Sequence, residues 1–194
     1  MQKALNILAA FLFLTLTSAA QAQWLPSQAS LRYSAQVSNG PAGDCGCFTL
    51  QGAAGDLFWN LGPAKPRLGV GIAFDAGVEH TGDVNGAGYG LTLSTFTAGP
   101  RLKLPMGKSQ AFAQELFGVA HGSGSEFPQS NNTLIQSANS FALDVGAGAD
   151  YPINRRLSLR FLQVDYLRTA LPNNSTNWQN NLRIAAGLTL HFSH

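Results

Sequence analysis

The chain has 194 residues, of which 45% are hydrophobic and only 11% are charged, and its formal net charge is +2. Soluble domains usually carry about a quarter charged residues, so this composition leaves few charges for an aqueous surface. The basic residues are scattered and form no stripe, which argues against nucleic-acid binding. No segment has the long apolar run that a membrane-spanning helix requires.

The N-terminus has the pattern of a secretory signal peptide. Lys3 precedes an apolar run at residues 4–16, and small residues then lead to the cleavage-like triplet Ala20-Gln21-Ala22. The apolar run is shorter than the roughly 20 residues that span a bilayer as a helix. We therefore predict a cleaved signal peptide at residues 1–22 and a single domain at residues 23–194.

The rest of the chain alternates large apolar residues with small or polar ones, most clearly at residues 182–192. A period of two is typical of strands in outer-membrane barrels, where one face meets lipid. We predict an all-β fold: a closed, antiparallel, eight-stranded up-and-down transmembrane β-barrel whose last strand pairs with the first near Leu31. The predicted strands lie at about 29–37, 47–59, 67–79, 88–104, 109–121, 137–151, 155–169 and 180–192.

The predicted connections alternate in length. Those near 62–66, 105–108 and 152–154 are tight, whereas those at 38–46, 80–87, 122–136 and 170–179 are longer, which matches short periplasmic turns and long external loops. The alternation changes phase within 88–104 and within 155–169, and we expect a β-bulge in each. Seven aromatic residues are candidates for the girdles at the membrane interfaces: Trp24, Tyr33, Trp59, Tyr89, Tyr151, Tyr166 and Trp178.

The charged residues fall largely on the same face of the strands as the glycines. If that face lines the interior, acidic and basic side chains nearly balance, which favours a paired, hydrogen-bonded network. A soluble lipocalin-like barrel would reverse the two faces, and the scarcity of charges favours lipid outside. The predicted interior charge network consists of Arg32, Arg67, Asp75, Glu79, Arg101, Lys103, Asp144, Asp150, Arg160, Asp165 and Arg183.

Eight strands enclose an interior that side chains can fill, so we expect no general diffusion pore. The leading hypothesis is a structural, envelope or surface-interaction protein without enzymatic activity. A narrow channel or a small-ligand transport barrel is the alternative, because the inward face carries both charges and many glycines.

Two sets of residues carry candidate chemistry. Cys45 and Cys47 would meet an oxidising periplasm, which favours a disulfide between them over free thiols or a metal site. His121 and Ser123 are the candidates for a lipid A-modifying enzyme, with Glu115 or Glu126 as the acid, but no oxyanion donor is identifiable.

No metal site or cofactor is predicted. The four histidines are dispersed and lack the spacing of a zinc site. The segment Asp83-Val84-Asn85-Gly86 resembles part of a calcium loop, but it lacks the later glutamate, so a hairpin turn is the better interpretation.

Several stretches of residues 23–194 resemble small bacterial outer-membrane barrels of the porin-family and OmpA/OmpX-like type. The resemblance implies a Gram-negative outer membrane, insertion by the barrel-assembly machinery, contact with outer-membrane lipid and lipopolysaccharide, and roles in envelope integrity, adhesion or defence. It also implies a C-terminal assembly signal at Leu188, Leu190 and Phe192, although Ser193 and His194 follow the aromatic residue on which such chains usually end. The stretches are Cys45-Gly46-Cys47-Phe48, Gly99-Pro100-Arg101, 111–118 (AFAQELFG), 163–169 (QVDYLRT) and 180–192.

Overall fold

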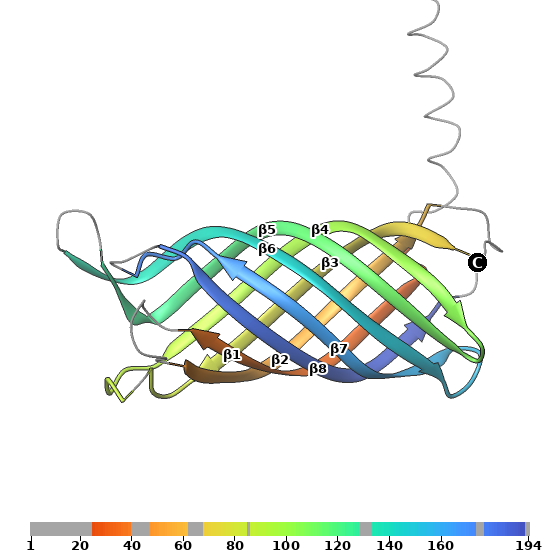
Figure 1. Cartoon of the computed structure of the whole chain (residues 1–194), viewed down its shortest axis with the longest axis horizontal. Helices are drawn as coiled ribbons and strands as arrows, with labels where there is room; N and C mark the ends of the chain where they lie inside the picture. The colour runs from red at the N-terminus through yellow and green to blue at the C-terminus, as the bar shows by residue number, and fades with distance from the viewer. Residues whose placement is uncertain are drawn as a thin grey trace, which may run out of the picture.

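The structure is a computed structural model that describes residues 25–39, 47–61, 68–84, 86–128, 133–173 and 177–192. Each strand pairs antiparallel with the next, and β8 pairs with β1, so the sheet closes into a barrel (Figure 1). The predicted eight-stranded closed barrel is confirmed. The strands are β1 (Gln28–Asn39), β2 (Cys47–Asn60), β3 (Gly69–Thr81), β4 (Leu91–Met106), β5 (Ser109–Pro128), β6 (Leu134–Pro152), β7 (Leu157–Thr169) and β8 (Gln179–His191).

The two ends of the barrel differ. We use "short-turn end" for the end that carries the β2–β3, β4–β5 and β6–β7 connections, and "long-loop end" for the end that carries the other four. In Figure 1 the long-loop end lies at the left. The predicted signal peptide at residues 1–22 lies outside the described residues and stays a prediction.

The β1–β8 seam closes at the predicted place, with Leu31 opposite Leu188. The neighbouring Gly187 faces Arg32 across this seam, and a Cβ atom there would lie 2.0 Å from the Leu31 carbonyl oxygen. Closure therefore requires a residue without a side chain at this point.

Large apolar side chains point outward from every strand, whereas charged side chains are buried inside. The lipocalin-like alternative, which needs the opposite arrangement, is wrong. No helix in the described part of the chain is long and apolar enough to cross a membrane. One exposed apolar residue from each strand in order illustrates the outward belt: Leu31, Leu57, Ile72, Phe96, Phe117, Phe141, Leu159 and Leu182.

Of the two predicted bulges, only the one in β7 is confirmed. Arg160 pairs with Gly187 and Gln163 with Ala185, so two β7 residues, both pointing outward, face a single residue of β8. The bulge predicted in β4 is wrong, because β4 keeps a constant register with β3 and β5. The alternation of apolar residues in β4 changes phase because one of them, Leu93, points inward and is only 3% exposed.

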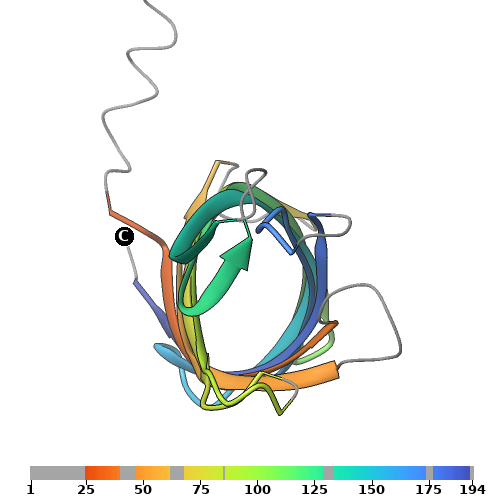
Figure 2. The same ribbon diagram turned by 90° about the vertical axis from the view of Figure 1, so that its left-hand side faces the viewer.

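The predicted loop at 122–136 is also wrong over most of its length, since β5 continues to Pro128 and β6 begins at Leu134. The register between these strands shifts between Ser123 and Phe127, and Gly124 adopts a positive φ of 76° within this irregularity. Viewed from the long-loop end, the last part of β5 bends inward across the mouth of the barrel (Figure 2). The inward bend buries Phe127.

Glu115 is an exception in the outward belt, since it is exposed on β5 between Ala113 and Phe117. A carboxylate on a lipid-facing surface is destabilising, though less so than Arg or Lys. We expect Glu115→Leu to raise the free energy of unfolding by roughly 1–2 kcal/mol, measured by urea unfolding from lipid vesicles. The matched change Glu126→Leu, at an exposed position near the long-loop end, should alter it by less than about 0.5 kcal/mol. Equal effects of the two changes would contradict a lipid-facing Glu115.

Candidate functional site

The middle of the lumen holds a cluster of charges centred on Asp56 of β2. The Asp56 carboxylate accepts a hydrogen bond from Arg32 and lies 2.6 Å from Nη1 of both Arg101 and Arg160. Arg160 also donates from Nε to Asp150, at 2.8 Å. These five residues, termed the Asp56 cluster, are all at most 3% exposed.

A second cluster lies closer to the long-loop end and is centred on Arg183 of β8. Its guanidinium lies 2.5 Å from Asp144 and 3.2 Å from Asp165. Asp75 and Glu79 lie slightly farther away, at 3.5 and 3.6 Å. These five residues, termed the Arg183 cluster, place four carboxylates around one guanidinium.

The two clusters form one network because Arg32 donates to both Asp56 and Asp75. Neutral side chains complete it: Gln114 of β5 accepts two hydrogen bonds from Arg101, at 2.9 and 2.6 Å. All eight strands thus contribute to a packed polar layer in the lumen. Pairing offsets the several kcal/mol that each buried charge would otherwise cost.

The structure places the predicted charges as follows. Arg67 lies outside the described residues, and the other ten are buried in the lumen. Lys103 is the one of these ten that joins neither cluster. Sequence reasoning missed Asp56, the centre of the first cluster, and the neutral Gln114. A usable signal for Asp56 was its position beside Leu57, which is exposed on the outward face.

Above the Arg183 cluster, the lumen changes from polar to apolar. A layer of buried apolar side chains occupies this level of the lumen. It includes Phe127 from the inward-bent end of β5, and Gly122 leaves room for the Phe127 ring. The apolar layer therefore occupies the lumen on the long-loop side of the ionic network. Its buried members are Leu50, Leu93, Ala120, Phe127, Ala138, Ala142, Leu167 and Leu171.

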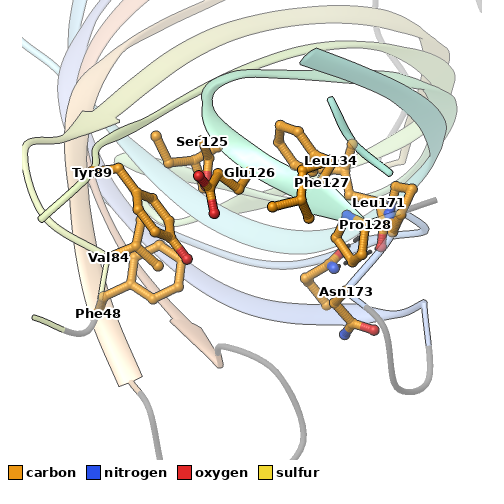
Figure 3. Close-up of a pocket in the computed structure, with 13 residues that line it drawn as sticks. Phe48, Val84, Tyr89, Ser125, Glu126, Phe127, Pro128, Leu134, Leu171 and Asn173 are labelled. Carbon is orange, nitrogen blue, oxygen red and sulfur yellow. Dashed lines mark hydrogen bonds between the residues drawn. The ribbon is translucent and has the colours of Figure 1, made fainter. Parts of the chain in front are cut away.

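A pocket of about 290 Å³ lies at the mouth beyond this apolar layer. Phe48, Val84 and Tyr89 stand on one side of it, and Phe127, Leu134 and Leu171 on the other (Figure 3). Tyr89, a girdle candidate, lines this mouth pocket. The pocket is mostly apolar, with Glu126 and Gln179 among its few polar residues.

The candidate catalytic residues do not form a relay in the structure. His121 Nδ1 lies 2.7 Å from Asn139 Oδ1, and the structure gives no hydrogen bond between His121 and Ser123, both of which are described. Glu115 faces outward within the belt. A serine nucleophile needs an adjacent base, and the base is engaged elsewhere.

The remaining candidates have the following places. Asp83 accepts a hydrogen bond from the Gly88 amide at 3.1 Å, as in a turn. In the described ranges, no three His, Cys, Asp or Glu side chains gather to hold a metal. Cys45 lies outside those ranges, as does the side chain of Cys47, so the predicted disulfide stays a prediction.

The proposed assembly-signal residues Leu188, Leu190 and Phe192 are all exposed on the outward side, at 48%, 49% and 44%. The Phe192 amide donates to the Ser27 carbonyl at 2.9 Å, which ties the end of β8 to the start of β1. Ser193 and His194 lie outside the described residues.

An apolar exterior around a buried ionic interior, on eight closed antiparallel strands, defines a transmembrane β-barrel. Residues 7–192 match the model of the outer membrane protein beta-barrel domain family, and the chain belongs to that family. Membership places it with bacterial outer-membrane proteins. A comparison with curated protein sequences finds no significant match.

Solved structures share the fold at low sequence identity. Neisserial surface protein A (NspA) aligns with a TM-score of 0.61 at 10% identity, over 85% of this chain and 96% of that one. Ail, the attachment invasion locus protein of Yersinia pestis, aligns with a TM-score of 0.53 at 14% identity, over 87% of this chain and 100% of its own. A second Ail structure, in complex with the heparin analogue sucrose octasulfate, aligns with a TM-score of 0.51 at 15% identity, over the same 87% and 100%.

We expect Asp56→Asn to destabilise the barrel strongly, because it leaves three buried guanidinium groups without their shared carboxylate. Breaking a buried ion pair from one side typically costs about 3–5 kcal/mol, which urea unfolding in lipid vesicles would measure. Asp83→Asn, in an exposed turn, keeps an acceptor for Gly88 and should change little. Equal stability of the two variants would show that Asp56 does not organise the interior.

Proposed function

We propose that this protein is a structural and surface-interaction barrel of the outer membrane, and that it is neither a general diffusion pore nor an enzyme. The observation that supports this proposal is that buried side chains occupy the lumen at two levels, first the ionic network and then the apolar layer that includes Phe127. We infer that no wide passage runs along the axis, so the surfaces left for function are the two ends and the belt.

The composition of the long-loop end supports a particular kind of partner. The four connections at residues 40–46, 82–90, 129–133 and 170–178 contain no Lys or Arg, but they include Asp44 and Asp83. Glu126 adds a third carboxylate at this end. We therefore propose a neutral or cationic partner. The binding of a heparin analogue seen in Ail does not extend to this chain, because a polyanion needs a basic surface.

The outward belt of apolar side chains also suggests partners within the envelope. The exposed apolar side chains support contact with outer-membrane lipid. Arg168, stacked 4.1 Å over Trp178 near the long-loop end, offers a cation to lipopolysaccharide phosphates. The outward residues Leu188, Leu190 and Phe192 support recognition by the barrel-assembly machinery during insertion.

Single-channel recording tests the closed lumen. Purified protein in a planar bilayer should give no reproducible conductance steps, whereas an open porin treated in the same way serves as the positive control. Steps that persist in repeated preparations, and that change when Asp56 or Arg183 is substituted, would replace this proposal with the narrow-channel alternative.

The mouth pocket supports a second candidate, the binding of a small apolar molecule. We expect benzyl alcohol to shift the methyl NMR signals of Leu91, Leu134 and Leu171 in lipid nanodiscs. The belt residues Leu159 and Leu188 report simple partitioning into the lipid. Equal shifts at pocket and belt leucines would rule out specific binding at the mouth.

A further inference from the structure

A second hollow, of about 300 Å³, opens at the short-turn end, opposite the mouth pocket. Its lining includes Gln28, Lys103, Gln110 and His191, together with Phe58. In liquid water, this volume would hold about ten molecules. Unlike the mouth pocket, it is lined mainly by polar groups.

Lys103 is the unusual residue of this hollow, because it is 4% exposed and yet forms no salt bridge with any described carboxylate. Its Nζ donates to Gln28 Oε1 and lies 3.6 Å from the centre of the Phe58 ring. An ammonium group has three protons to donate, and one glutamine oxygen and one ring face do not neutralise its charge. A buried cation normally has an anionic partner.

The surrounding charges do not supply that partner. Arg101 lies nearby, with its guanidinium 5.9 Å from the centre of the same Phe58 ring. Arg160 in turn shares the Phe112 ring with Arg101, at 4.4 and 4.8 Å from the ring centre. Asp56 is shared by three arginines, and Asp150 is held by Arg160. With Lys103 included, this part of the lumen holds four cations and two carboxylates, so its field attracts anions.

The polar rim of the hollow is held in place by hydrogen bonds. His191 lies between Ser158, 2.7 Å from its Nε2, and Gln28, 3.0 Å from its Nδ1. The Gln28 amide also lies 3.5 Å from Gln110 Oε1. These contacts fix the rim of the hollow, while the Lys103 ammonium, which donates to Gln28, has further protons to donate to an oxygen ligand.

We propose that the hollow at the short-turn end binds a phosphate-type oxyanion, with Lys103 as the anchoring cation. Water can fill the space, but it supplies no counter-charge, and a lysine buried without one tends to lose its proton. An oxyanion fills the space and also stabilises the protonated form of Lys103. Lysine acts as a point charge and suits phosphate, while the planar, bidentate recognition of carboxylates relies on arginine. Both nearby arginines are already engaged with Asp56.

Two sources could provide this chemistry: free phosphate in the periplasm or the phosphate of a lipid headgroup. The site does not depend on which partner the long-loop end contacts. Conductance steps in bilayer recordings would overturn the proposed function but not this inference. Likewise, a failure to bind phosphate would overturn this inference but not the proposed function.

Thermal unfolding of the full barrel in maltoside micelles, which contain no phosphate, tests the site. Inorganic phosphate, compared with chloride at equal ionic strength, should raise the unfolding temperature saturably, on the order of 3–6 °C at a tenfold excess over Kd. Lys103→Met should abolish the rise. Lys108→Met removes an exposed lysine in the adjacent turn and should retain it. An equal rise in all three proteins, or none in the unchanged chain, overturns the proposal.

A second measurement keeps the test valid if Lys103→Met does not fold. In the unchanged chain labelled with ¹⁵N-lysine, phosphate should shift the Lys103 Nζ signal and leave that of Lys108 in place. Short-chain phosphatidylglycerol, added instead of phosphate, distinguishes the sources: a shift with both probes indicates that headgroups reach the site, and a shift with phosphate alone indicates the free ion. No shift with either probe overturns the inference.

Discussion

The structure depends on one constraint: a polar group that points into a barrel surrounded by lipid can find partners only among the other groups in the lumen. Eight strands enclose so little space that these partners come from distant parts of the chain. Asp56 of β2 contacts Arg101 of β4 and Arg160 of β7, which are 45 and 104 residues away in sequence. The pair with Arg160 of β7 reaches across the β1–β8 seam and so requires a closed barrel, which couples the ionic network to the completion of the barrel.

The same constraint explains how much the sequence could predict. Where large and small residues alternate, as around Leu182, the two faces can be told apart, and the predicted strands, seam and inward charges follow. In β2 the segment Gly52-Ala53-Ala54-Gly55 has no such contrast, which leaves the neighbouring Leu57 as the local signal for the inward direction of Asp56. The prediction for β4 failed for another reason: it assumed a polar interior throughout, whereas Leu93 lies where the lumen has become apolar.

Contacts within the lumen are harder to predict than its faces, because they depend on height along the axis. Arg160 and Asp165 have opposite parity, and both point inward only because the β7 bulge lies between them. As a result, Arg160 contacts Asp56 and Asp150, whereas Asp165 contacts Arg183. The inward bend of β5 was equally hard to predict, because its sequence of Gly, Ser, Phe and Pro also fits an ordinary loop. Only the contacts of Phe127 in the folded barrel determine the direction of the bend.

Near balance of charge over the whole lumen does not mean balance at each level. The Arg183 cluster has four carboxylates for one arginine, while the Asp56 cluster has three arginines for two carboxylates and lies beside Lys103. Because Arg32 bridges the two levels, the charges are held apart along the axis within one connected network. A closed barrel of this kind can therefore present an acidic, apolar-lined mouth at one end and a cationic hollow at the other. The side chains that occupy the lumen thus set the chemistry of each end, and the ends are exposed surfaces at which such a barrel can act.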